Sequence, residues 1–228
     1  MAVTVTRDGV RDTHVVVPVA DAGREARISF DSGLERVDLR AGDGQGPLLA
    51  ATFGEPLPVV WAVDHNVHIE YPFGSRMLRR VGPNEMRINP TVPWALDVHG
   101  GASHLDANLA DIDVRSVGVH SGAAHVHLRL GHPTGRCPIR LSSVKDLRIE
   151  RPAGTPVRLE IAKGAVEISL DDLRYGAVGG GLVAQSQGYD PDTAHYLVTI
   201  AGGAQHVTIV EIGNAPPSLP NLLRRLNK

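Results

Sequence analysis

Histidine is the residue whose number and spacing in this sequence could do chemistry. The chain holds 11 histidines in 228 residues, and five of them fall close together. These five are His99, His104, His120, His125 and His127. Imidazole binds metal ions and changes its charge near neutral pH. Protonating all 11 side chains would change the formal net charge from −2 to +9, so a surface that gathers them responds to mild acid.

Two pairs of residues lie 21 positions apart and offer ligands for a metal ion. The candidate ligands are His104, Asp106, His125 and His127. If neighbouring strands set the pairs side by side, they present nitrogen and oxygen donors of the kind that zinc binds. Side chains on adjacent strands stand parallel, however, and no further group is placed to orient the ligands. We expect a solvated polar face here, with no metal and no cofactor, and keep the four residues as the candidate metal site.

No set of residues predicts an enzyme. His132 and Cys137 could form a nucleophile pair, but no third group orients the histidine and no oxyanion hole is indicated. The glycine-rich run at 176–181 lacks the lysine and hydroxyl of a phosphate-binding loop. The single cysteine also excludes a disulfide within the chain. The sequence therefore predicts a non-enzymatic protein.

A repeated phrase positions the histidines. The phrase is Gly-Ala-x-x-apolar-x-apolar, and copies begin at residues 101, 122, 143 and 164, each 21 residues after the last, with Ser143-Val144 replacing Gly-Ala in the third. A further copy begins at residue 203, and a degenerate one at residue 33. Apolar residues alternate with polar ones at the end of the phrase, which is the period of a β-strand. Each copy is therefore predicted to be a strand, with a second alternating stretch before it.

The 21-residue spacing predicts the fold. It leaves no room for a helix between strands, so the strands must stack as successive coils. We expect an all-β, single-domain, right-handed parallel β-solenoid, in which equivalent residues of adjacent coils lie roughly 4.8 Å apart. The third residue after each motif glycine would then form a column of His104, His125, Asp146 and Glu167. The fifth would form a second column of Asp106, His127, Arg148 and Ser169.

Three parts of the chain are distinguished within the one expected domain. Residues 1–92 fit the repeat poorly and are expected to form irregular first coils with an antiparallel hairpin, at 59–63 and 67–71, that caps one end. Residues 93–214 are the regular coils. Residues 215–228 form an amphipathic tail with a short helix at 218–226, which either caps the other end or contacts a partner or a membrane. The partner-binding candidates in this tail are Leu219, Leu222, Leu223, Arg224, Arg225 and Leu226.

Six short phrases occur in an order that resembles a known domain family. They are Pro93–Leu96, Gly100–Ser103, Ser121–Ala123, Glu150–Gly154, Gly179–Gly181 and Tyr196–Ala204. The series resembles the bacterial toastrack domain, the β-solenoid module at the C-terminal end of LiaF-type cell-envelope stress proteins and related adhesin-type proteins. The resemblance covers about half of the chain and implies a non-catalytic sensing or scaffolding module. Members are commonly joined to membrane-spanning helices, whereas this sequence contains no apolar run of that length.

Charge and targeting signals narrow the expected function. A nearly neutral chain is neither a nucleic-acid clamp nor a polybasic membrane anchor. Without a signal-peptide run, the expected location is the cytoplasm, with recruitment to the membrane by a partner. We therefore expect a protein-interaction or sensing scaffold of the bacterial cell-envelope stress response, with an unidentified protein partner. Two alternatives stay open: a self-assembling homo-oligomer resembling bactofilin β-helices, and a metal- or carbohydrate-binding protein.

Overall fold

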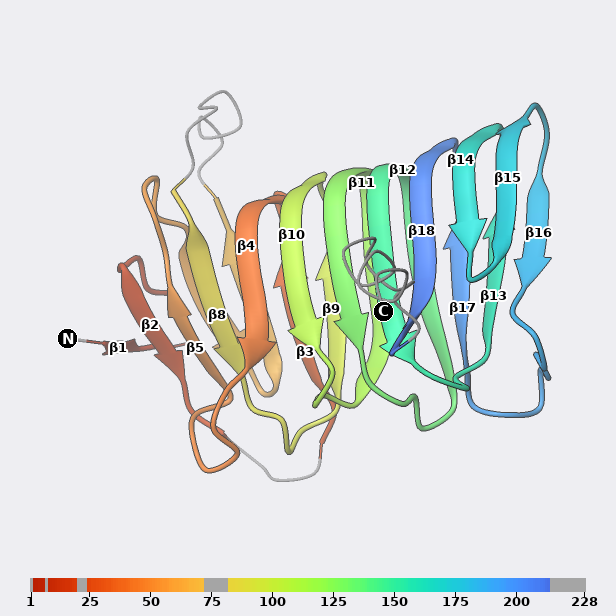
Figure 1. The fold of residues 1–228 in the computed structure, drawn as a ribbon. Coiled ribbons are helices and arrows are strands. Elements are labelled where there is room, and N and C mark those ends of the chain that lie inside the picture. The colour runs from red at the N-terminus through yellow and green to blue at the C-terminus, as the bar shows by residue number, and fades with distance from the viewer. Residues whose placement is uncertain (1, 7, 20–23, 72–81, 214–228) are drawn as a thin grey trace, which may run out of the picture.

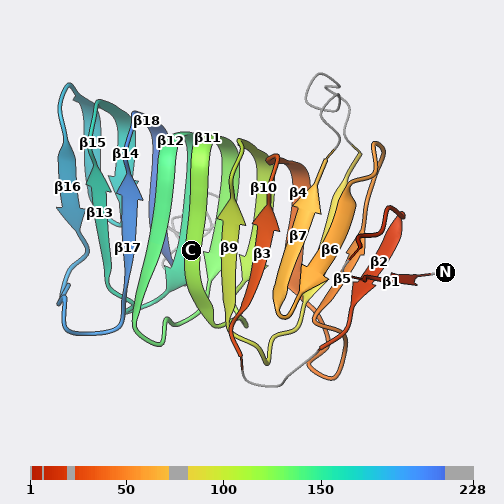
Figure 2. The ribbon, with the colours of Figure 1, turned by 180° about the vertical axis from the view of Figure 1, so that it is seen from behind.

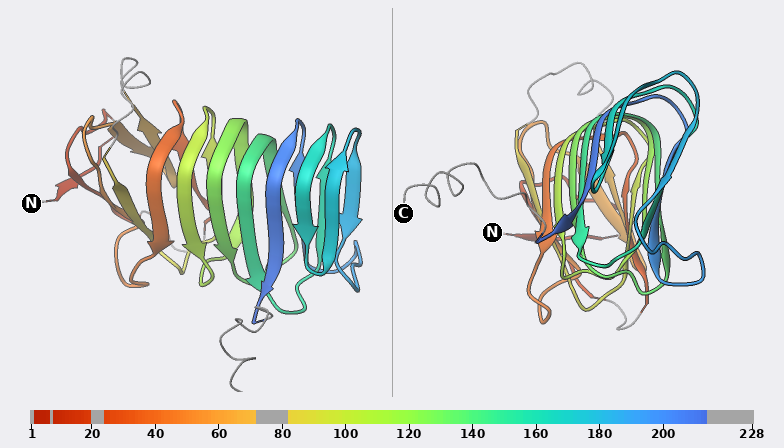
Figure 3. Two further views of the ribbon diagram at one scale, coloured as in Figure 1. Left: turned by 45° about the horizontal axis from the view of Figure 1, so that its top comes forward. Right: turned by 45° about the vertical axis from the view of Figure 1, so that its right-hand side comes forward.

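Two rows of strands face each other across an apolar core (Figures 1 and 2). The computed structural model describes residues 2–6, 8–19, 24–71 and 82–213. These residues form 18 strands and no helix, so none of them belongs to a helix that could cross a membrane. The all-β prediction is confirmed. Seen from one end, the strands follow a curled path around the core (Figure 3).

The first row, here called the front row, has these strands in pairing order: β1 (Val3–Thr4), β2 (His14–Val17), β5 (Leu49–Thr52), β8 (Asn84–Ile88), β4 (Leu34–Ala41), β10 (Ala102–Leu109), the second half of β11 (Val114–Leu130), the second half of β12 (Arg136–Pro152), β18 (Ala204–Ile212), β14 (Ala165–Leu170) and β15 (Leu173–Val178). The back row has β6 (Val59–Val63), β7 (Asn66–Glu70), β3 (Ala26–Phe30), β9 (Trp94–Val98), the first halves of β11 and β12, β17 (His195–Ile200), β13 (Val157–Ile161) and β16 (Leu182–Gln185).

Pairing is parallel through the middle of both rows and includes antiparallel pairs toward their ends. From β8 to β14 in the front row, and from β7 to β13 in the back row, every neighbouring pair is parallel. Strands β5, β6, β15 and β16 pair antiparallel with the stack, and beyond β5 the front row continues with β2, antiparallel to it, and β1. The hairpin predicted near residues 59–71 is present as β6 and β7.

The order of the coils in space departs from their order in the chain, which corrects the sequence prediction. Strands β17 and β18 lie between β12 and the pair β13 and β14, although they follow both in sequence (Figure 1). Strands β3 and β4 likewise lie between the coil of β7 and β8 and the coil of β9 and β10. Between the copies of the phrase at residues 164 and 203 the chain forms no further parallel coil, because β15 and β16 turn back antiparallel there. The helix predicted at 218–226 lies outside the described residues.

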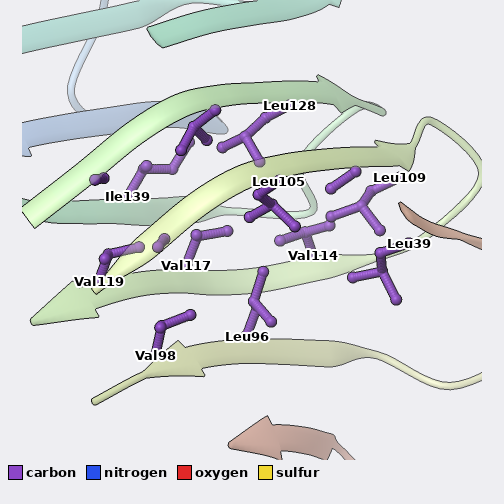
Figure 4. Close-up of a cluster of buried hydrophobic side chains, with 14 of the residues drawn as sticks. Leu39, Leu96, Val98, Leu105, Leu109, Val114, Val117, Val119, Leu128 and Ile139 are labelled. Carbon is purple, nitrogen blue, oxygen red and sulfur yellow. The ribbon is translucent and has the colours of Figure 1, made fainter. Parts of the chain in front are cut away.

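The core forms because alternate residues of each strand are apolar and point inward. One inward column of the front row has members that are at most 2% exposed, and it runs through Val37, Leu105, Val126, Leu147, Val207 and Ile168. Figure 4 shows Leu105 and Leu109 facing Leu96 and Val117 of the back row. Burying each such side chain contributes roughly 1.5–3 kcal/mol to folding. The buried apolar residues make one continuous cluster.

The coil of β17 and β18 can lie against β12 because the residue at its corner, Gly202, has no side chain. A Cβ atom on Gly202, between β17 and β18, would lie 2.7 Å from the carbonyl oxygen of Ser142 in the corner of β12. Glycine alone allows that approach. The Gly202 amide instead donates a hydrogen bond of 2.5 Å to the Ser142 oxygen.

A buried arginine fastens the same coil at its other end. Arg151 on β12 is 0% exposed, and its guanidinium lies 2.5 Å from Asp171 Oδ2 and 2.8 Å from Glu211 Oε1. Asp171 follows β14 and Glu211 lies on β18, so this ion cluster joins three adjacent front-row strands. A guanidinium withdrawn from water needs such partners, since an unpaired buried charge costs several kcal/mol.

Replacing this arginine should therefore destabilise the whole fold. We expect Arg151→Ala to lower the free energy of unfolding by about 3–5 kcal/mol in urea titrations. The exposed Arg140 of the same strand is the control, and Arg140→Ala should change it by at most about 0.5 kcal/mol. Equal effects of the two substitutions would contradict this role for Arg151.

Candidate functional site

Six adjacent front-row strands each hold one residue in the left-handed backbone region, with φ between 50° and 56°. In spatial order these residues are Arg36, His104, His125, Asp146, His206 and Glu167. Each is the third residue after the first position of its copy of the repeated phrase. We call this set the left-handed column. It crosses the front row from β4 to β14 (Figure 1).

The repeated phrase itself creates this backbone conformation. In β10, two residues rather than one separate the inward Ala102 from the inward Leu105. The extra residue breaks the alternation of the strand, as in a β-bulge, and His104 takes the left-handed conformation. Every strand of the column has the same insertion, so the register between neighbouring strands is preserved on both sides of it.

The column is energetically costly and contains no glycine. A left-handed conformation costs a non-glycine residue roughly 1–2 kcal/mol, whereas glycine adopts it freely. The chain has 25 glycines, yet all six positions carry a cationic, anionic or imidazole side chain. Four of the six are histidine or aspartate, which adopt this conformation more readily than most residues, whereas Arg36 and Glu167 have no such preference.

Imidazoles and carboxylates contact one another along the column. The rings of His104 and His125 stack with centroids 4.7 Å apart. His125 Nδ1 lies 3.1 Å from one oxygen of Asp146, and His206 Nδ1 lies 2.7 Å from the other. His206 Nε2 then reaches Glu167 at 3.2 Å. The hydrogen bond from His206 is the main reason that the pKa of Asp146 is lower than its ordinary value of 3.8, and the charge of His125 adds to the effect.

A second charged column runs beside the first, two residues further along each strand. His127 lies 3.7 Å from Asp106 on one side and 3.5 Å from Glu150 on the other. Glu150 also accepts hydrogen bonds from Arg129, at 3.0 Å, and Arg148, at 2.8 Å. Burial alone would raise the pKa of Glu150, but these arginines hold it below its ordinary value. The front face thus presents closely paired charges of both signs.

The structure separates the four candidate metal ligands into these two columns. His104 stacks on His125, while His127 pairs with Asp106, so the four side chains do not converge on one point. No group of three or more His, Cys, Asp or Glu side chains among the described residues is arranged to hold a metal ion. The column expected from His104 to Glu167 exists, but it also includes His206 between Asp146 and Glu167. The sequence copy at residue 203 was the available signal for that histidine.

The remaining clustered histidines lie away from the front face. His99 and His120 stack with centroids 5.2 Å apart, at the ends of the back-row segments of two neighbouring coils. His120 Nε2 contacts Asp97 at 2.7 Å, and Arg27 contacts the other oxygen of Asp97 at 2.5 Å. The five histidines therefore divide between two surfaces instead of forming one.

The conceivable nucleophile pair is not assembled. The Cys137 side chain points into the core at 2% exposure, and burial raises its pKa to about 12. A thiol with that pKa stays protonated at neutral pH and is a poor nucleophile. His132 instead contacts the hydroxyl of Thr155 at 3.1 Å. The six partner-binding candidates of the tail, from Leu219 to Leu226, lie outside the described residues.

Comparison with known proteins supports the fold and leaves the family open. No protein-family model matches the chain. No curated protein matches it in sequence. Its structure is similar to the crystal structure of a putative cell adhesion protein from Clostridium sporogenes, with a TM-score of 0.56 and 14% sequence identity over 90% of this chain and 100% of the other. At that identity the likeness extends to the fold alone, and the toastrack resemblance is not confirmed.

Two histidines on one strand test the left-handed column. At His125, glycine should leave the melting temperature nearly unchanged, while valine should cost about 1–2 kcal/mol because a β-branched residue tolerates positive φ poorly. His127 is the control, since its φ is not in the left-handed region. There the order should reverse, with His127→Gly costing about 0.5–1 kcal/mol and His127→Val tolerated. The same order at both positions would contradict the assignment.

The lowered pKa of Asp146 predicts a pH-dependent contribution to stability. A carboxyl group whose pKa falls on folding stabilises the protein above its unfolded pKa, and this contribution is lost as the pH falls through the folded value. Asp146→Asn keeps a residue that tolerates positive φ but removes the charge between His125 and His206. Wild type should melt above the variant at neutral pH, and the difference should close below about pH 4. A difference that persists undiminished well below that pH would contradict the prediction.

Proposed function

We propose that this chain is a non-enzymatic interaction module that binds a protein partner through its front face, with the left-handed column at the centre of the contact. The supporting observation is the column itself, where six strands keep an unfavourable backbone conformation and a charged or imidazole side chain. Natural proteins retain such strain mainly where a side chain must be aimed for function. The similarity in fold to a putative adhesion protein is in keeping with a binding role.

The chemistry of the front face suits a polar, charge-complementary partner. Asp146, His206 and Glu167 are partly exposed, at 31%, 39% and 70% of their side-chain surfaces, so a partner can compete for their contacts. Paired charges of both signs fix the register of a complex and reject partners with the wrong pattern. Protonation of the imidazoles would add positive charge to the same face in mild acid.

We further propose that the partner belongs to cell-envelope stress signalling and recruits the module from the cytoplasm to the membrane. This part of the proposal is supported by the six ordered sequence phrases that resemble toastrack domains. Self-assembly of copies of this chain end to end is the alternative function. The antiparallel pairs that β5, β6, β15 and β16 form toward the two ends argue against it, because they interrupt the parallel register that a growing stack would have to continue.

Affinity capture from a lysate of the source cells, followed by binding measurements with the purified partner, tests the front-face proposal. The diagnostic variant combines His104→Gly, His125→Gly and His206→Gly, because glycine keeps the left-handed backbone while removing each ring. Its affinity should fall by about tenfold or more, since several contacts of about 0.5–1.5 kcal/mol are lost together.

A control variant on the opposite face makes the result specific. Arg136 and Arg140 are exposed on the back-row half of β12, and replacing both with alanine should leave the affinity unchanged. Equal binding by the triple-glycine variant and wild type would contradict the proposal. Large, concentration-dependent polymers in size-exclusion chromatography would favour the self-assembly alternative.

A further inference from the structure

The two ends of the stack differ in how the chain covers them. At one end, here called the covered end, β1 pairs along the edge of β2, and Val10 exchanges two hydrogen bonds of 2.8 Å with Val60 of β6. At the other, here called the open end, the last strands are β15 in the front row and β16 in the back row (Figure 1). Among the described residues each of these two pairs along one edge only, so its outer edge can accept a further strand.

Apolar side chains reach solvent at the open end. Leu173 of β15 stands opposite Leu170 of β14, which is 0% exposed, yet Leu173 is 44% exposed. Opposed residues of an antiparallel pair point to the same face, so Leu173 is an inward side chain that is left uncovered. Val183 of β16 is 59% exposed. At the covered end, in contrast, Val17 of β2 and Val60 of β6 are 2% and 0% exposed.

We propose that two copies of this chain join through their open ends, with β15 antiparallel to β15 of the second copy and β16 antiparallel to its β16. A two-fold axis perpendicular to the rows brings both pairs of edges together at once, because the two rows end side by side (Figures 1 and 2). A single added peptide strand would cover only one of the two edges. A two-fold contact uses the same surface on both copies, so the assembly stops at two.

The front-row edge is complementary to itself in this arrangement. In the register that pairs the whole of β15 with its copy, Leu173 stands opposite Val178. Both face inward, since Val178 stands opposite the buried Ala165 of β14. Tyr175 then stands opposite Gly176 of the second copy, and an aromatic ring packs well over a strand glycine. The uncovered inward side chains of one copy are thus covered by those of the other.

The back-row edge is self-complementary in the same way. Leu182 and Ala184 of β16 are both buried, at 8% and 4% exposure, and point inward. Setting Leu182 opposite Ala184 of the second copy keeps both on the inner face and places Val183 against Val183 on the two-fold axis. The exposed side chain of Val183 is then covered by its own copy.

Charge is also complementary across the contact. Arg174 is exposed on β15 and contacts the carbonyl oxygens of Asp171 and Leu173, with no carboxylate partner among the described residues. In the proposed register it stands opposite Ala177, and Glu167 of the second copy, which is 70% exposed, lies two strands away. That separation is roughly 10 Å, which the two long side chains can span together. The pair occurs twice in the dimer and favours this register over others.

The dimer goes beyond the proposed function and does not depend on it. It uses the open end of the stack and, of the left-handed column, only the last member, Glu167. The three histidines removed in the triple-glycine variant lie on other strands, so loss of partner binding and loss of the dimer are separate results.

Analytical ultracentrifugation of the full chain tests the proposal, and it should show a reversible equilibrium between monomer and dimer with no larger species. Val183→Lys places two ammonium groups side by side on the axis and should raise the dimer dissociation constant about tenfold or more. Val63→Lys is the matched control, because Val63 is 41% exposed on β6 at the covered end, and it should dimerise like wild type. Both side chains are exposed, so neither substitution should unfold the monomer.

A cysteine variant tests the position of the axis. Val183→Cys sets two thiols beside each other, and mild oxidation should link the copies by a disulfide. Val63→Cys should stay unlinked, and the native Cys137, at 2% exposure, should not take part.

Four outcomes would overturn the proposal: a chain that stays monomeric at all concentrations, species larger than two copies, a dimer that Val183→Lys leaves intact, or Val183→Cys that does not cross-link. A monomer whose β15 amides are protected from hydrogen exchange would show in addition that a segment of the same chain covers the edge. A monomer that still binds a protein through its front face would overturn the dimer alone.

Discussion

Backbone hydrogen bonding between adjacent coils is the interaction on which the rest of this structure depends. From β8 to β14 the front-row strands pair in parallel register, so Ala102 stands beside Ala123, and Ala123 beside Val144. Parallel register sets like positions next to one another and turns a repeat along the sequence into columns in space. Inward columns make the core and outward columns make the charged face. A slip of one residue would exchange the two, so the core and the candidate site are held by the same constraint.

The sequence predicted correctly which residues lie side by side wherever consecutive copies of the phrase form adjacent parallel strands. The 21-residue spacing placed His125 beside His104 and Asp146 beside His125, and both contacts or pairings are present. It placed Glu167 beside Asp146, where His206 lies instead. The spacing of the repeated phrase identifies similar segments, but it does not say which of them pair. The reversal of direction at β15 and β16 leaves no sign in the phrase, so it could not be predicted from the spacing. The free edge of β12 is then filled by the like segment that comes later.

Backbone conformation and buried polarity were harder to foresee than pairing. Two residues between Ala102 and Leu105 signalled an irregular strand, but they did not predict a positive φ at His104, because histidine adopts that conformation more often than most residues and still only rarely. Six neighbouring strands impose that conformation together, which is a tertiary effect. Tyr71 has a buried hydroxyl with no hydrogen-bond partner among the described residues, which is likewise a result of packing between coils, since nothing in its local sequence excludes water. Features of this kind become visible only when the whole stack is considered.

The position of β17 and β18 between earlier coils also governs how the protein is made. While the chain emerges from the ribosome, β12 and β14 each lack one of their final neighbours until β18 has been synthesised. Such non-local pairing folds slowly, and the waiting strand edges can pair with other chains. In a regular repeat array each new repeat packs on the one before it, whereas here the last two strands insert between strands that were synthesised earlier. The contact between the coils up to β12 and the strands β13 to β16 is therefore completed only by the last two strands of the described chain.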